Sequence, residues 1–85
     1  MNKFETYLID NGIHFKVAGR YGRIADKYIL WLKAHGLKAG AITRSKYLEW
    51  IKECRQMGNC ERTIIIKENV IKHYYYFLGT KNNPA

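Results

Sequence analysis

Apolar residues that recur every three or four positions constrain the fold of this chain more than any other feature of its sequence. Four stretches show this spacing, and a glycine or an Asn-Pro pair follows each of them: 2–9, 17–35, 44–57 and 62–78. A period near 3.6 residues is that of an amphipathic α-helix, and glycine is the residue that most often ends one. The pattern predicts an all-α fold, a compact orthogonal bundle of about four helices.

The longest of these stretches, 17–35, is predicted to supply the central packing surface, with Gly36 as its stop. Its apolar side is formed by Val17, Tyr21, Ile24, Ala25, Tyr28, Trp31 and Leu32. The shorter stretch 2–9 places Phe4, Tyr7 and Leu8 on one face, and Asn11 with Gly12 follows as its stop. We expect this short helix to cover the core like a lid.

The third helix, 44–57, is predicted to start at Thr43, because a threonine hydroxyl can accept a hydrogen bond from the first turn. The residues expected to face inward are Tyr47, Leu48, Ile51 and Cys54, and Gly58 is expected to end the helix. Lys46 stands where a capping box would place an acid. A basic first turn opposes the helix dipole, which suggests a phosphate nearby.

The fourth stretch, 62–78, opens with the β-branched residues 63–66, which by propensity could begin a strand. A helix is predicted instead, because apolar residues keep the helical period for four turns through Ile64, Ile71, Tyr75 and Leu78. Residues 80–85 are interpreted as the start of a linker, so residues 1–79 are expected to form the domain.

Charge indicates the class of partner. Fifteen Lys and Arg against seven Asp and Glu give a formal net charge of +8 in 85 residues, with a pI near 9.7. A polyanion is the expected partner, with double-stranded DNA first and an anionic membrane surface second. The longest apolar run, 74–78, is too short to cross a bilayer, and the first residues do not read as a secretory signal. We therefore expect a cytoplasmic location and no membrane span.

Four cations form the sharpest candidate site: Lys16, Arg20, Arg23 and Lys27. Their spacing of four, three and four places them on one helix face, opposite the apolar stripe. Like charges in a row repel one another, so a polyanion that neutralises the row gains by releasing counterions. The alternative is an ordinary solvated helix face.

The fourth helix offers a second, weaker face: Arg62, Ile66, Asn69, His73 and Tyr76. Arg62 and the helix N-terminus are placed to meet a phosphate, whereas Ile65 and Ile66 facing outward would equally suit a protein contact. Arg44, with Lys38 and Lys46, forms a third cationic cluster.

Local spacing in the sequence does not bring together a Ser-His-Asp or a Cys-His set of the kind used in nucleophilic catalysis. We therefore predict no enzyme activity. Three histidines and two cysteines lack the spacing of a zinc site, and neither a metal nor another cofactor is expected. Cys54 and Cys60 are expected to be reduced thiols.

The order of these patterns resembles the core-binding, SAM-like N-terminal domain of tyrosine recombinases, the phage-type integrases of mobile elements. Three segments carry the resemblance over almost the whole chain: 4–37, with Tyr21, Tyr28, Trp31, Leu32 and Gly36; 42–58, with Thr43 and Tyr47; and 63–84, with Ile71, Tyr74, Tyr75 and the Asn-Pro exit. The resemblance implies a module that clamps duplex DNA at the recombination core site for DNA integration, without catalytic residues of its own. The active site would belong to a second domain after the exit.

The resemblance also implies site residues. The family's DNA-facing positions fall on Lys16, Val17 and Arg20, and the further candidates for phosphate contact on the last helix are Arg62, Thr63 and Lys67. Two departures stand out: valine at 17 where the family often has threonine, and the pair 65–66 where it often has Asn-Arg. Other integrase subunits on DNA are a second expected partner, and the isolated module is expected to be monomeric. From the resemblance we expect a bacterial or phage-encoded origin, and we expect no arm-binding domain upstream.

Overall fold

Four α-helices make up most of the protein in the computed structural model, which describes residues 3–79. Their bounds are Lys3–Asp10 for α1, Phe15–Ala34 for α2, Arg44–Gln56 for α3 and Glu61–Leu78 for α4, and a 3-10 turn, η1, spans Ala39–Ala41. No strand occurs within the described part of the chain. The all-α prediction is confirmed, including the choice of helix over strand at 63–66. The predicted linker, 80–85, lies outside the described residues.

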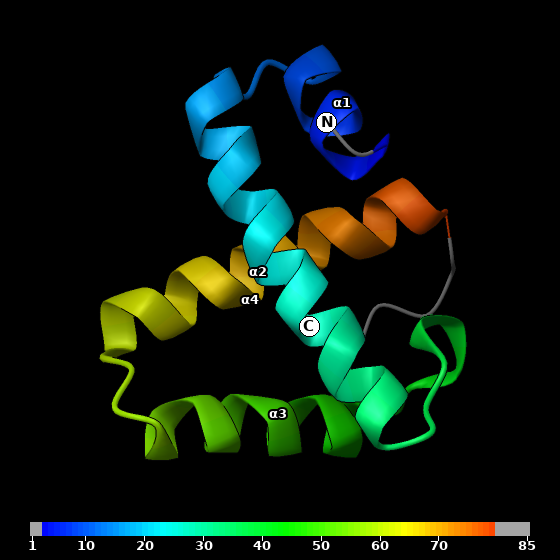
Figure 1. Ribbon diagram of the computed structural model, residues 1–85, viewed down its shortest axis with the longest axis vertical. Helices are drawn as coiled ribbons and strands as arrows, with labels where there is room; N and C mark the ends of the chain where they lie inside the picture. Colours follow the sequence, from blue (N-terminus) through cyan, green and yellow to red (C-terminus); the bar gives the residue numbers. More distant parts are fainter. Residues whose placement is uncertain (1–2, 80–85) are drawn as a thin grey trace.

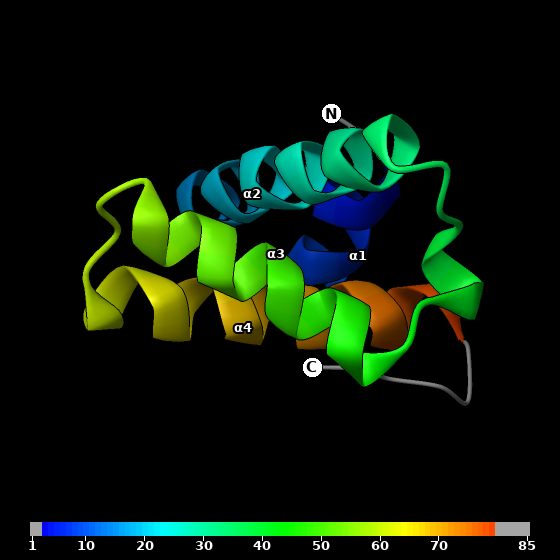
Figure 2. The ribbon, with the colours of Figure 1, turned by 90° about the horizontal axis from the view of Figure 1, so that it is seen from below.

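The helices form a flat body whose extents are 31 × 28 × 19 Å. α2 crosses over α4, so that the two make its upper and lower layers in the view of Figure 2. α3 lies along one edge and α1 packs at the other end against both α2 and α4 (Figure 1). One face of α2 is therefore turned into the molecule, and the opposite face forms its outer surface.

A cluster of aromatic rings occupies the centre of this core. Tyr28 and Trp50 meet edge to face, with ring centroids 4.8 Å apart. The Tyr75 hydroxyl donates a hydrogen bond to the Ala39 carbonyl at 2.7 Å, so the Tyr28 hydroxyl, 2.9 Å away, donates to Tyr75. This buried chain ties α2, α4 and η1 together, because each hydroxyl needs its partner once it is removed from water.

The predicted glycine stops after α1, α2 and α3 and the predicted cap of α3 are confirmed, whereas the Asn-Pro exit predicted after α4 lies outside the described residues. At the end of α2, Gly36 has a φ of +66°, a conformation that side chains with a Cβ rarely adopt. Its N–H donates to Lys33 and that of Leu37 donates to Leu32, at 3.1 and 2.9 Å, which is the Schellman arrangement. The glycines after α1 and α3 are also in the left-handed region. Thr43 caps α3 as predicted, accepting from the Lys46 N–H at 3.3 Å.

Two predicted inward positions are wrong. Leu48 is 47% exposed, and Trp50 takes its place in the core of α3, beside Tyr47, Ile51 and Cys54. That set is spaced three, four and seven residues from Tyr47, which centres the buried face one position away from Leu48. Leu78, 39% exposed, ends α4 where the chain leaves the core.

The buried face of α2 is also shifted from the prediction. Ala18 and Gly22 are buried beside Ala25, whereas Val17, Tyr21, Ile24 and Trp31 are only half-buried. A Cβ on Gly22 would lie 2.7 Å from the Glu5 Cγ, so small residues are what allow α1 to pack closely here. α2 begins two residues earlier than predicted, because the His14 Nδ1 accepts from the Lys16 N–H at 3.2 Å and caps it.

Candidate nucleic-acid interface

The predicted basic row is fully displayed on the outer face of α2. Lys16, Arg20, Arg23 and Lys27 are all exposed, on the side of the helix opposite its buried residues. The row spans 11 residues, which at a rise of 1.5 Å per residue is about 16 Å. Among the described residues, no ion pair involves any of the four; the two pairs found join Lys46 to Glu49 and Arg55 to Glu61. Asp26, an exposed acid beside Lys27, makes no ion pair with the row, which is therefore a band of unpaired cations.

The same outward face continues past the cations. Leu30, three residues after Lys27, is 64% exposed, and Ala34 follows at the next turn. An exposed leucine in line with four cations adds an apolar contact to a surface otherwise suited to phosphate. This extension was not predicted from the sequence, although Leu30 and Ala34 follow Lys27 at the same three- and four-residue spacing as the row.

Arg44 lies apart from the row. It opens α3, which follows the C-terminal end of α2, whereas Lys16 stands at the other end of that helix. Arg44 is exposed, and Lys46, two residues further on, is paired with Glu49 at 3.2 Å. Glu49 thus neutralises part of the positive charge of this first turn, which was the feature that suggested a bound phosphate.

The candidates on α4 belong to the other layer of the molecule (Figure 2). Arg62 is exposed on the first turn. Thr63 is half-buried, and its hydroxyl lies 3.4 Å from the Cys60 sulfur. That hydrogen bond, together with backbone N–H groups of the first turn, lowers the pKa of the Cys60 thiol. These residues and the row on α2 thus lie in different layers of the molecule.

Lys67 is engaged within the fold. Its Nζ donates to the Cys54 sulfur at 3.5 Å and lies 5.8 Å from the centre of the Trp50 ring. A phosphate contact through Lys67 would require the ammonium group to leave both partners, so that role stays a prediction.

The outward face of α4 is rotated from the one predicted. Ile66 and His73 are half-buried, Ile66 against the core and His73 stacked on Tyr21 at 6.4 Å between ring centroids. The outward face instead carries Arg62, Ile65, Asn69, Lys72 and Tyr76. The rotation arises because α4 packs against α1 as well as α2 and α3, which also buries Val70 and Tyr74.

Within residues 3–79 no group of three or more His, Cys, Asp and Glu side chains could hold a metal ion. Both cysteines are free; Cys54 is buried and Cys60 is exposed. None of the described helices is long and apolar enough to cross a membrane.

Comparisons with family models, curated proteins and solved structures gave no match for this chain. The resemblance to integrase core-binding domains therefore stays a prediction from the sequence.

Proposed function

We propose that this chain is a DNA-binding module that contacts the phosphates of duplex DNA through the outer face of α2. The observation that carries the proposal is the row of Lys16, Arg20, Arg23 and Lys27, exposed together and unpaired among the described residues. Phosphate contacts supply most of the affinity of sequence-independent DNA binding, and they need cations that are not already neutralised.

The small size of the basic row determines how tightly the module should bind DNA. One short row makes only a few phosphate contacts, so we expect dissociation constants from about micromolar to roughly 0.1 mM at physiological salt. A second DNA-binding domain on the same chain would raise the affinity through its effective concentration. Modest sequence specificity follows, because phosphates carry no sequence information.

The biological setting we propose is that of a tyrosine recombinase. In this setting the module forms one half of a clamp at the recombination core site, and the catalytic residues lie in a separate domain. This part of the proposal is supported only by the order and spacing of the sequence patterns named above.

A second candidate is a protein-interaction module that docks through the outward face of α4. Ile65 and Tyr76 on this face are 57% and 67% exposed. Because α2 and α4 form opposite layers, a partner on α4 would leave the row on α2 open to DNA. The two functions are compatible.

Chemical-shift mapping with a short duplex separates the two candidates. The proposal predicts shifts along 16–27 that grow with added DNA. Shifts confined to the outward face of α4, with 16–27 unchanged, would contradict it and favour the protein-interaction module. Polyglutamate of the same net charge as the duplex is the control for nonspecific attraction.

A further inference from the structure

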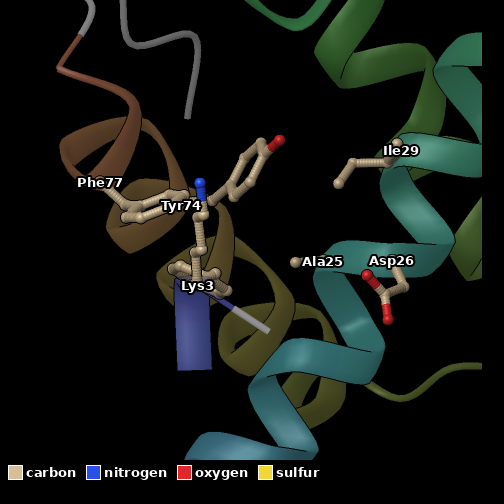
Figure 3. Close-up of a pocket in the computed structure, with 7 residues that line it drawn as sticks. Lys3, Ala25, Asp26, Ile29, Tyr74 and Phe77 are labelled. Carbon is tan, nitrogen blue, oxygen red and sulfur yellow. The ribbon is translucent and has the colours of Figure 1, made fainter. Parts of the chain in front are cut away.

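Two stacked aromatic rings stand exposed at the start of α2, beside the basic row. Phe15 is 58% exposed, whereas the other two phenylalanines line a pocket between α1, α2 and α4 (Figure 3). The His14 ring stacks on that of Phe15, with centroids 4.6 Å apart and planes inclined by 29°. His14 is held in place, because its Nδ1 accepts the hydrogen bond from the Lys16 N–H. Since His14 covers one face of the Phe15 ring, the exposed area of Phe15 belongs largely to its other face and its edge.

Open space lies next to these rings along α2. Gly19 follows Phe15 by four residues, so the two stand on the same side of the helix, one turn apart. A Cβ on Gly19 would meet no atom within 4 Å. Glycine inside a helix is less favourable than alanine, and no packing contact requires one here. The missing side chain leaves room for a flat group beside the Phe15 ring.

The charges near the rings favour a nucleic acid as the ligand. Between residues 11 and 25 the chain carries three cations, which are the first three of the basic row, and no acid. Asp10, which ends α1, is the acid nearest to Phe15 in the sequence. Adjacent residues of a helix point about 100° apart, so Phe15 stands to one side of Lys16 and of the row. A strand whose phosphates lie along the row therefore has an aromatic ring beside it, where a base would project.

We propose that Phe15 stacks on an unpaired base of DNA that is bound through the basic row, so that the module prefers duplexes carrying an unpaired nucleotide. The inference rests on the proposed function and names the kind of DNA that the same site selects. In a paired duplex each base is covered by its neighbours, and it must leave the stack at a cost in free energy before a side chain can cover its face. An unpaired base needs little of this free energy, and stacking on an aromatic ring then adds affinity for any of the four bases. One stacked base should strengthen binding about tenfold.

Two DNAs that differ by a single base test the inference. Each is a duplex with one extra nucleotide in one strand, an adenine in the first and an abasic site in the second, so length, ends and number of phosphates are equal. The native protein should bind the first about tenfold more tightly. Phe15→Ala should bind the two equally, whereas Phe15→Trp should keep the difference. Tyr76→Ala removes a similarly exposed ring from α4, in the other layer of the molecule, and is the matched control that should also keep it.

Gly19→Leu gives a second test that leaves both rings in place. Leucine is a good helix former and the site has open space, so this variant should fold. Its side chain should occupy the space beside Phe15 and reduce the preference for the adenine to about twofold or less. Its affinity for the abasic DNA should stay within about twofold of native, because the basic row is unchanged.

The outcomes separate the inference from the proposed function. Equal affinity of the native protein for the two DNAs overturns the inference, leaves the proposed function standing and favours a protein partner for the exposed ring. A preference that survives Phe15→Ala or Gly19→Leu, or that Tyr76→Ala removes, also overturns the inference alone. Failure to bind either DNA contradicts the proposed function and the inference with it.

Discussion

Two buried tyrosine hydroxyl groups in the core are expected to affect the stability of the fold in opposite ways. The Tyr75 hydroxyl accepts from Tyr28 and donates to the Ala39 carbonyl, whereas the buried Tyr47 hydroxyl has no hydrogen-bond partner among the described residues. A buried polar group costs free energy when it is unpaired and is roughly neutral when it is paired. Two tyrosines of equal burial thus differ in what their oxygen contributes.

Tyr75→Phe should lower the free energy of unfolding by about 1–3 kcal/mol, because it leaves the Tyr28 hydroxyl and the Ala39 carbonyl without partners. Tyr47→Phe removes an unpaired hydroxyl and should change stability by less than about 0.5 kcal/mol or raise it. Urea unfolding of both variants gives the comparison. An equal loss in both would mean that the Tyr75 hydrogen bonds contribute nothing.

The same burial makes the fold sensitive to alkaline pH. Burial raises the pKa of Tyr28 well above its ordinary value, with a further rise from its hydrogen bond to Tyr75, and burial also raises the pKa of Tyr47 and Tyr74. In the unfolded chain these phenols ionise near pH 10. Since the native state holds their protons more tightly, its stability is complete below pH 10 and falls as the pH rises above it.

We therefore expect helical circular dichroism to disappear over the same alkaline range in which the phenolate absorbance of the buried tyrosines appears. Tyr28→Phe removes one of these ionisations. The loss of stability between neutral and alkaline pH should therefore be smaller in this variant than in the native protein. Tyr76→Phe, at an exposed position, should leave it in place. Ionisation of the buried tyrosines with the helices intact would show that they are not held as the structure describes.

At the scale of the elements, the sequence predicted which helices exist and where they stop better than which face each one buries. Gly36 and Thr43 act through local backbone geometry, which depends on neighbouring residues alone, and both were predicted. The exchange of Leu48 for Trp50 depends instead on where α3 meets its neighbours. Apolar spacing allows either residue to face inward, so tertiary packing decides.

Gly19 within α2 and Gly36 just after it give a matched test at this scale. Gly19 lies within the helix with open space where a Cβ would be, so Gly19→Ala should stabilise the protein by about 0.5–1 kcal/mol. Gly36, at a φ of +66°, should lose about 1 kcal/mol or more as alanine. Thermal unfolding of the pair measures both. If both substitutions stabilise the protein, α2 does not end at Gly36.

For the whole molecule, the basic row was predicted correctly as an exposed helix face because periodicity places side chains around a helix without any tertiary knowledge. Sequence could not show that α4 lies in the opposite layer, or that Lys67 turns toward Trp50, since both follow from how the helices cross. The charge of +8 acts over the entire surface, so a test of the row must hold net charge constant.

The salt dependence of DNA binding tests the central claim most directly, with two variants of equal net charge. Lys16→Gln with Lys27→Gln removes two charges from the row, and Lys52→Gln with Lys72→Gln removes two from exposed positions on α3 and α4. Four phosphate contacts predict a slope of log K against log salt near −3.6 for the native protein, from about −0.9 per contact. We expect the row variant to reduce the slope to about −1.8 and the control to keep it near the native value. Equal slopes for the two variants would contradict binding through the outer face of α2.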